Sequence, residues 1–431
     1  MTPIRSDALA PVANWPRLVR VRQRFGGEPL TDVPAATRAA LAELDLGARV
    51  QPGARIAITA GSRGVLNIVA VTRTVVEVMR ELGAEPFVIP AMGSHGGATP
   101  PGQMRLLAGY GITPEAVGAP VISRGEVVEL GVSPSGIPLC ADKLAAEADG
   151  LLLINRVKPH TDFHGVIESG PTKMLAIGLG KQRSALACHT WFVERGYEAV
   201  IREVGDALWA RLPLLGALGL VENGHHATVR VGAVRPASHE ADESALLALA
   251  REVFADLPFT RLDVLLVDQM GKDISGTGMD PNVTGADPAK LHARRESPFI
   301  WRVCVRGLSA GTHGNATGLG QADFVLARCA EQVDWQATAI NAVTAASPEG
   351  ARCPVVCATD LDLLRAAFQT SGPRPPEAKR LVWVRDTLRL DEFWASQALA
   401  DEARAHPRCE VLGAPRELAF GPDGALFSPW E

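Results

Sequence analysis

The sequence predicts an α/β protein of two α/β domains, each with a mostly parallel sheet, and an active-site cleft between the domains. Short segments rich in Val, Ile and Leu alternate with longer stretches of helical periodicity, which is the pattern of parallel strands covered by helices. Several of these apolar segments run directly into polar, glycine-rich loops. The length of 431 residues also exceeds what a single domain usually holds.

The predicted strands are short apolar runs of the kind that parallel sheets bury on both faces. They cover residues 55–59, 86–90, 151–154, 263–267, 353–357 and 380–384. Helices are expected at 66–82, which Gly83 ends, and at 184–211, 243–255 and 360–369. The periodic pattern of apolar residues becomes less regular over 222–242, and a new strand begins near 260. The predicted domains are therefore 1–262 and 263–431.

Composition excludes several classes of protein. The chain is 47% hydrophobic and 21% charged with a formal net charge of -5, which argues against general binding of nucleic acid. Seven scattered cysteines without CxxC spacing fit a reducing compartment. The first residues lack the features of a signal peptide, and no apolar run reaches membrane-spanning length. We therefore expect a cytoplasmic protein without nucleic-acid or membrane partners.

Four polar loops follow predicted strands at their carboxyl ends, where ligands bind in open α/β sheets. These loops are 60–63, 91–97, 155–160 and 268–272. Together they carry arginine, histidine, glutamine and lysine side chains. This set predicts one site for a small anion.

Three histidines in or beside these loops are candidates for acid–base work, because an unperturbed imidazole titrates near neutrality. His95 lies between Ser94 and two glycines, and His160 follows Pro159. His95 could instead be a structural histidine that caps a helix or bonds a carbonyl. His160 and His164 have the spacing of a zinc pair on a helix, but the flanking proline and glycine argue against a helix there.

Lys173 lies in Ser-Gly-Pro-Thr-Lys-Met-Leu, among apolar and glycine residues that favour a buried position over a solvated one. A buried lysine can be nucleophilic, because loss of hydration favours its neutral form. A phosphate-binding P-loop is excluded, since Pro171 stands where the lysine of that motif belongs. His189 is a further candidate ligand. Its neighbour Cys188 is not expected to share a metal with it, because adjacent helical side chains diverge.

The second half of the chain adds further candidates. Gln269 and Lys272 follow a predicted strand and could jointly bind a carboxylate, although an ordinary loop is equally compatible. Gly307-Leu-Ser309-Ala-Gly matches the nucleophile elbow of serine hydrolases, yet the residues after Ser309 form a poor helix. The same segment, with Asn315 and Thr317, fits better a loop over the site or a helix start that binds an anion.

The order and spacing of these residues resemble the nickel-pincer lactate racemase family and its isomerase relatives, over most of residues 55–325. The resemblance is carried by Lys173 in Ser-Gly-Pro-Thr-Lys, by His189, by His95 in Gly-Ser-His-Gly, and by His160 in Lys-Pro-His. Gln269, Lys272 and Arg63 match the family's substrate-binding pattern.

The resemblance implies a role for each residue. Lys173 would carry the covalently attached cofactor, a pyridinium-3-thioamide-5-thiocarboxylic acid mononucleotide that holds nickel, and His189 would complete the nickel coordination. His95 and His160 would be the acid–base pair. Arg63, Gln269 and Lys272 would bind the substrate carboxylate, with Ser62, His164, Asn315 and Thr317 as possible further site residues.

The implied reaction is racemisation or epimerisation of a 2-hydroxy acid or sugar acid. One histidine takes the hydroxyl proton, the cofactor accepts hydride from the carbinol carbon, and hydride returns to the other face. Cofactor-maturation proteins would then be partners. Ala60 replaces the family's acidic residue, extra residues lie between His160 and Lys173, and Asp268 stands where an aromatic residue is common. These departures favour a divergent isomerase over lactate racemase itself.

Two other classes of function remain open on the sequence alone. A serine hydrolase would depend on Ser309 and would not respond to nickel. A non-catalytic protein that binds small anions would be stabilised by its ligand without turning it over.

Overall fold

The structure is a computed structural model that describes residues 2–62, 64–161, 163–287 and 295–430. The chain forms two compact units, one of Gly26–Phe254 and one of Met1–Phe25 with Ala255–Glu431. The predicted domains, 1–262 and 263–431, differ from these units in two places. The first 25 residues join the C-terminal unit, because their strand pairs there, and the crossing point lies at 254/255.

The central unit, Gly26–Phe254, contains a five-stranded sheet in the order β3-β2-β6-β7-β8. Strands β3, β2, β6 and β7 are parallel, and β8 is antiparallel to β7. A separate antiparallel hairpin joins β4 to β5. The strands are β2 (Arg55–Ala60), β3 (Glu85–Pro90), β4 (Val127–Val132), β5 (Pro138–Asp142), β6 (Gly150–Arg156), β7 (Leu214–Glu222) and β8 (Thr228–Val234).

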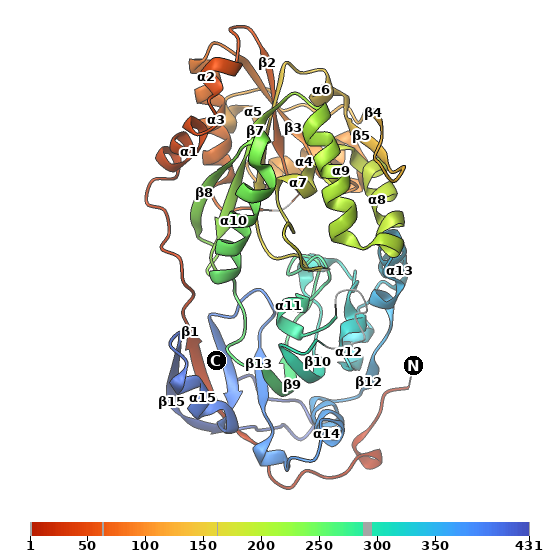
Figure 1. Cartoon of the computed structure of the whole chain (residues 1–431). Coiled ribbons are helices and arrows are strands. Elements are labelled where there is room, and N and C mark those ends of the chain that lie inside the picture. The colour runs from red at the N-terminus through yellow and green to blue at the C-terminus, as the bar shows by residue number, and fades with distance from the viewer. Residues whose placement is uncertain (1, 63, 162, 288–294, 431) are drawn as a thin grey trace. The chain divides into compact units, whose positions relative to one another are not determined.

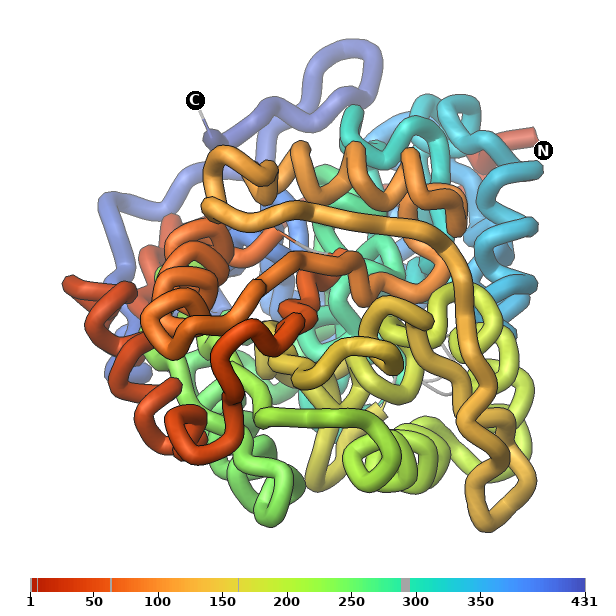
Figure 2. The backbone as a smooth tube through the Cα atoms, turned by 90° about the horizontal axis from the view of Figure 1, so that it is seen from above, coloured from red at the N-terminus to blue at the C-terminus, as the bar shows by residue number. Residues whose placement is uncertain are grey.

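Both faces of this sheet are covered by helices, as the apolar strands require. Alternate residues of β6 point to opposite sides, so Leu151 and Leu153 belong to one core and Leu152 and Ile154 to the other. The first core is closed by α8, α9 and α10, and the second by α1, α3 and α4. Figure 2 shows the red to orange helices α1 and α3 in one part of this unit and the yellow-green helices α8 and α9 in another.

The helices of the central unit are α1 (Val33–Ala42), α2 (Leu46–Arg49), α3 (Ile68–Glu81), α4 (Pro100–Gly109), α5 (Pro114–Val117), α6 (Lys143–Ala146), α7 (Pro171–Lys173), α8 (Lys181–Arg195), α9 (Tyr197–Arg211) and α10 (His239–Glu252). A π-helical segment, Met174–Leu179, continues α7 directly. Short 3-10 turns lie at Gly96–Ala98 and Pro236–Ser238. The labels are those of Figure 1.

The second unit has a mixed eight-stranded sheet in the order β12-β11-β10-β9-β13-β14-β1-β15. The strands from β12 to β13 are parallel, and β14, β1 and β15 extend the sheet in antiparallel pairs. The strands are β1 (Arg17–Gln23), β9 (Arg261–Val267), β10 (Phe299–Val305), β11 (Phe324–Leu326), β12 (Val355–Cys357), β13 (Leu381–Val384), β14 (Glu392–Ser396) and β15 (Cys409–Glu417).

This sheet contributes to a single continuous core in which the side chains of β9, β10 and β13 are almost fully buried. The helices of this unit are α11 (Pro281–Thr284), α12 (Ala327–Ala330), α13 (Trp335–Thr344), α14 (Asp360–Thr370) and α15 (Ala400–Ala405). Its 3-10 turns are Ser6–Ala8, Ala310–Thr312, Leu319–Gln321, Pro348–Ala351, Pro376–Ala378 and Gln397–Leu399.

The predicted α/β class with mostly parallel sheets is confirmed, and each predicted strand overlaps an observed one. The helix predicted over 184–211 is two helices, α8 and α9. Gly196 separates them with a φ of 79°, a left-handed conformation that glycine adopts readily and that stops a helix. Across the described ranges, no helix is both long and apolar enough to cross a membrane.

Candidate active site

The central unit brings its polar loops together where the order of its strands reverses. From β2 the chain first adds β3 on one side and later adds β6 on the other, so the carboxyl ends of β2 and β6 flank a switch point. Ligands bind at such points in open α/β sheets because neighbouring loops diverge there. The loops that follow β2, β3 and β6 carry Ser62, His95 and His160, respectively.

His160 and Lys173, predicted to serve one site, are in direct contact: the lysine Nζ meets the ring Nε2 of the histidine. His160 is only 5% exposed, and Lys173 is half-buried at the end of α7. A backbone bridge between Lys158 and Ser169 holds the two ends of the intervening loop together. The extra residues between His160 and Lys173 therefore form a closed loop that returns the lysine to the histidine.

The surroundings of His160 keep its imidazole neutral. Burial first, and then the positive charges of Lys173 and Lys158 and the rings of His164 and His189, hold the pKa of His160 well below 6.5. A neutral imidazole can accept a proton. The four neighbours also show that this is a cation-rich part of the unit, suited to an anionic ligand.

Glu168 organises the loop that carries His160. Its buried carboxylate accepts the backbone N–H of His160 at 2.5 Å and the N–H of Gly165 at 3.2 Å, and it pairs with Arg251 at 2.6 Å. His164 Nδ1 lies 3.3 Å from the same carboxylate. His164 therefore contacts Glu168, while the ring of His160 contacts Lys173. These bonds lower the pKa of Glu168 against the opposing effect of burial, so it stays ionised.

His95 is exposed, in contrast to His160, and its ring orientation is set by its own loop. Its Nδ1 lies 2.8 Å from the carbonyl oxygen of Met92. Since a carbonyl only accepts, Nδ1 carries the hydrogen and Nε2 presents a lone pair. The loop is attached to the lysine segment by a hydrogen bond of 3.0 Å from Gly93 N to Gly178 O.

Lys181 and Gln103 support the same loop from inside the protein. Lys181 is 5% exposed, pairs with Asp142 at 2.7 Å and donates to the carbonyl of Pro90 at the end of β3. Gln103 donates to the carbonyl of Gly93 at 3.2 Å. Neither residue was predicted from the sequence, because neither lies in a recognised motif.

The segment after Lys173 is π-helical, a rare conformation that is frequent at functional sites. It packs against the β3 loop so closely that a Cβ on Gly178 would lie 2.7 Å from the carbonyl oxygen of Ala91. The β2 loop lies on the same segment, because a Cβ on Gly61 would contact Met174 at 3.4 Å. The loops of Ser62, His95 and Lys173 are therefore neighbours.

Glu243 of α10 holds the residue before the lysine. Its Oε2 accepts from Thr172 N at 3.0 Å and from Thr172 Oγ1 at 2.7 Å, and Trp209 Nε1 donates to the same hydroxyl. Burial raises the pKa of Glu243 to about 7. A sequence signal for this residue exists: helical spacing places Glu243 on the buried face with Leu246 and Leu247.

His189 stands on α8 at the edge of an aromatic cluster formed by Phe163, Phe192 and Tyr197. Its ring centroid is 5.4 Å from that of Phe192, while the ring of His160 is 4.6 Å from that of Phe163. Cys188 is buried against the carbonyl of Ala176, and burial raises its pKa to about 12. His189 and Cys188 are adjacent on α8, but their side chains contact different groups.

Ser62 lies in the β2 loop, where its carbonyl accepts from Tyr110 Oη at 2.8 Å. The predicted substrate ligand Arg63, the next residue, is outside the described residues. Within the parts that the structure describes, no group of three or more His, Cys, Asp or Glu side chains is arranged to hold a metal ion.

The candidates of the other unit lie after β9 and β10. Gln269 lines a cavity of about 400 Å³, whereas Lys272 Nζ donates to Gly276 O at 2.7 Å within its own loop. Joint binding of a carboxylate by this pair stays a prediction. Asn315 and Thr317 bond each other at 2.7 Å, and both contact Asn341 of α13, so these side chains stabilise their loop locally.

Ser309 does not have the surroundings of a hydrolase nucleophile. Its hydroxyl donates to Asp273 at 2.5 Å, and a three-residue 3-10 turn follows it in place of the helix that the nucleophile elbow needs. The sequence match to that motif is therefore not accompanied by its structure.

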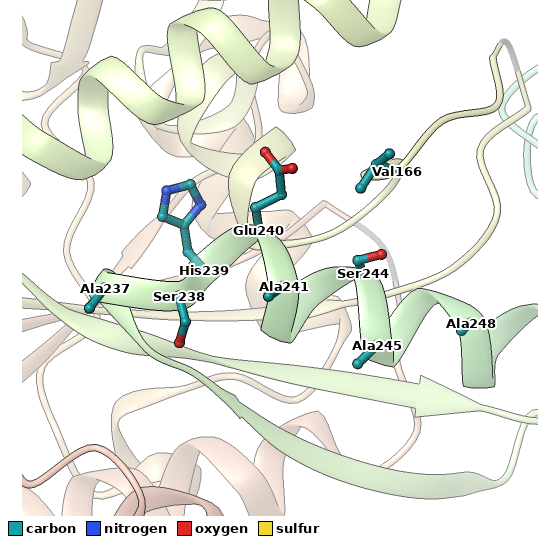
Figure 3. A pocket seen from close by; sticks show the side chains of 9 residues that line it. All are labelled: Val166, Ala237, Ser238, His239, Glu240, Ala241, Ser244, Ala245 and Ala248. Carbon is teal, nitrogen blue, oxygen red and sulfur yellow. The ribbon is translucent and has the colours of Figure 1, made fainter.

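A larger cavity of about 720 Å³ runs along the start of α10. Figure 3 shows it lined by the small side chains Ala237, Ala241, Ser244, Ala245 and Ala248, with Val166 on the loop opposite. Its ionisable members already have partners: Glu240 pairs with Arg202 at 2.7 Å, and His239 Nε2 lies 3.7 Å from Asp206. This cavity lacks the acid–base groups of the His160 site.

Part of the sequence and the fold are similar to known proteins. Residues 31–199 match the family described as the lactate racemase N-terminal domain, a range that includes His95, His160, Lys173 and His189. Comparison with the curated proteins gives no match. Among solved structures, the lactate racemase apoprotein from Thermoanaerobacterium thermosaccharolyticum is 13% identical, with a TM-score of 0.53 over 86% of this chain and 94% of that one. This likeness shows the fold. Residues 31–199, less than half of the chain, are similar to the lactate racemase N-terminal domain.

Proposed function

We propose that the protein is a racemase or epimerase of a 2-hydroxy acid or sugar acid, acting with a nickel-pincer nucleotide attached covalently to Lys173. The observation that carries the proposal is the contact between Lys173 Nζ and Nε2 of a buried, neutral His160. It joins an amine fit for covalent attachment to a base fit for proton transfer. The family match over residues 31–199 supports the same assignment.

The residues present fit such a cofactor. Lys158 and Lys173 place positive charge beside His160, which suits a ligand that carries phosphate and carboxylate groups. His189 supplies an imidazole, a ligand that suits nickel. When bound, the cofactor would supply a reversible acceptor for the hydride of the carbinol carbon. Its attachment and metal loading would require maturation proteins as partners.

The chain's own residues would handle the hydroxyl proton and orient the substrate. Neutral His160 can take the proton through Nε2 once the lysine amine is engaged elsewhere, and His95 presents the lone pair of its own Nε2. Two bases are needed because the hydroxyl lies on opposite sides in the two stereoisomers. Contacts of the substrate carboxylate with Arg63, Gln269 and Lys272 are the corresponding prediction for binding.

The first test concerns covalent attachment. Protein produced with the maturation enzymes should carry a mass adduct on Lys173 together with nickel, and Lys173→Ala should lack both by intact-mass and metal analysis. Lys143→Ala, an exposed lysine of the same unit, is the matched control and should retain both. An adduct that persists in Lys173→Ala would overturn the proposal.

A further inference from the structure

The second unit has a switch point of its own. Strand β9 has β10 on one side and β13 on the other, both parallel to it, and the chain adds β10, β11 and β12 before it crosses to β13. The cavity of about 400 Å³ lies at this point. Most of its lining comes from residues that directly follow strands: Asp268 and Gln269 after β9, Arg306–Leu308 after β10, and Arg385 after β13.

Four arginines line this cavity against a single carboxylate, Asp268. Asp268 is fully engaged: it accepts from Arg306 at 2.5 Å and from the indole N–H groups of Trp383 and Trp430, both at 2.7 Å. Arg306 is also bonded to Asp360 at 2.6 Å. Arg306 and Asp268 therefore form the inner wall, and neither is available as a ligand group.

The other three arginines of the cavity have fewer carboxylate partners than Arg306. Arg385 is exposed, lies 4.7 Å from the ring centroid of Trp430, and has no carboxylate within ion-pair distance among the residues that the structure describes. Arg328 has a half-exposed side chain and reaches Asp360 only at 3.3 and 3.4 Å. Arg389, the fourth, is paired with Asp386 at 2.5 Å.

The neutral lining adds further donors. The side-chain amides of Gln269 and Gln332 make no hydrogen bond within the described ranges. Four guanidinium groups face three carboxylates, Asp268, Asp360 and Asp386, which leaves one positive charge at the cavity. The N–H donors of the arginines and glutamines thus outnumber the carboxylate acceptors at this cavity, which lies at the switch point of the sheet.

We propose that this cavity is an anion-binding site that takes the carboxylate or phosphate group of a small molecule, with Arg385 and Arg328 as its charged donors. Guanidinium groups match both oxyanions because each presents parallel N–H groups. The cation–π contact with Trp430 holds Arg385 in place. The site is built wholly from one unit and does not depend on the cofactor proposed for Lys173.

Calorimetric titration of the full chain with malonate and, separately, inorganic phosphate at low ionic strength tests the site. We expect dissociation constants of about 1 mM or tighter, weakened about tenfold or more in Arg385→Ala and in Arg328→Ala. Arg404→Ala is the matched control, an exposed arginine of the same unit outside the cavity, and should bind as the unchanged protein does. Binding of one probe alone would identify a carboxylate or a phosphate as the ligand group.

Two further variants make the outcome decisive. Arg385→Lys keeps the charge but loses the paired N–H groups, so an intermediate affinity is expected. Lys173→Ala should bind both probes unchanged, which separates this site from the cofactor proposal. No heat of binding at about 10 mM of either anion, or an equal loss in Arg404→Ala, would overturn the site.

Discussion

Single side chains in the central unit are held in unusual protonation states by their surroundings. His160 is surrounded by cations and apolar rings, and its pKa lies well below 6.5, so its imidazole is neutral at neutral pH. The pKa of Glu243, on α10, is shifted in the opposite sense because it is buried. The two residues hold adjacent residues of α7, since His160 contacts Lys173 and Glu243 binds Thr172.

The depressed pKa of His160 predicts the pH profile of the reaction. When Lys173 carries the proposed cofactor, its charge no longer acts on His160, but burial, the largest cause of the lowered pKa, remains. The acid limb of kcat should therefore lie below 6.5 in the direction of the proposed reaction that begins with His160. For folding, the stability linked to this residue is present above about 6.5 and is lost as pH falls below it.

Replacement of His160 checks this assignment in the loaded enzyme. His160→Gln should lower kcat by about 10²- to 10⁴-fold and leave the Lys173 adduct intact. His225→Gln, an exposed histidine of the β7–β8 turn, should leave both the rate and the acid limb unchanged. An acid limb at or above 6.5 in the unchanged protein would contradict the assignment.

Glu243 predicts a second, independent effect of pH. The folded protein keeps this proton up to about pH 7, whereas the unfolded chain releases it near its ordinary value of 4.5. The folded state therefore loses stability as pH rises from about 4.5 to 7, by about 3 kcal/mol in total.

Glu243→Gln removes that dependence and keeps an acceptor for Thr172. Urea unfolding at pH 5 and pH 8 should show the variant gaining about 2–3 kcal/mol relative to the unchanged protein at the higher pH. Glu252→Gln, exposed at the end of the same helix, is the control and should follow the unchanged protein. If the free energy of unfolding changed equally between pH 5 and pH 8 in Glu243→Gln and in the unchanged protein, the raised pKa of Glu243 would be refuted.

At the scale of elements, the π-helical segment connects the loops that carry the candidate residues. It begins directly after Lys173, and Gly178 within it binds the backbone of the His95 loop. A Cβ at Gly178 would lie 2.7 Å from the Ala91 carbonyl oxygen, a backbone atom that cannot move aside easily. The approach of the two loops thus depends on this glycine.

Gly178→Ala should therefore separate the His95 loop from the lysine segment. We expect a loss of about 1–3 kcal/mol in the free energy of unfolding, as for overpacking elsewhere, together with a lower kcat in the loaded enzyme. Gly109→Ala, at a helical position with open space, should be neutral or slightly stabilising. Equal stability of the two variants would show that the contact is unimportant.

At the scale of the whole molecule, the chain begins and ends in the same unit. Strand β1 pairs with β14 on one side and β15 on the other, although it precedes both by more than 350 residues. The central unit, Gly26–Phe254, contains its own sheet and both of its cores. The first 25 residues should therefore matter to the folding of one unit only.

Removal of residues 1–25 should raise hydrogen exchange in β14 and β15 and leave β2, β3 and β6 protected. Removal of residues 2–14 alone keeps β1 and should affect only the edge at β12, where Ile4 bridges Cys357. Loss of protection throughout the central unit in the longer deletion would show that the units fold together.

The sequence by itself determined six strands (β2, β3, β6, β9, β12 and β13), the helical regions of α3, α8, α9, α10 and α14, and the loops that carry the candidate residues. Those features depend on local periodicity and on glycine and proline, which act within a few residues. The α/β class follows from the same alternation, and the family resemblance from short motifs around His95, His160 and Lys173. The break at Gly196 was missed, although its signal is local.

Only the tertiary structure decided which distant groups meet. The partners of β1, the support of the His95 loop by Lys181 and Gln103, the bond of Glu243 to Thr172, and the arginines of the second unit's cavity all join residues far apart in the chain. Burial and charge then set the protonation of His160 and Glu243. These depend on the sum of many neighbours in space, which no local pattern contains.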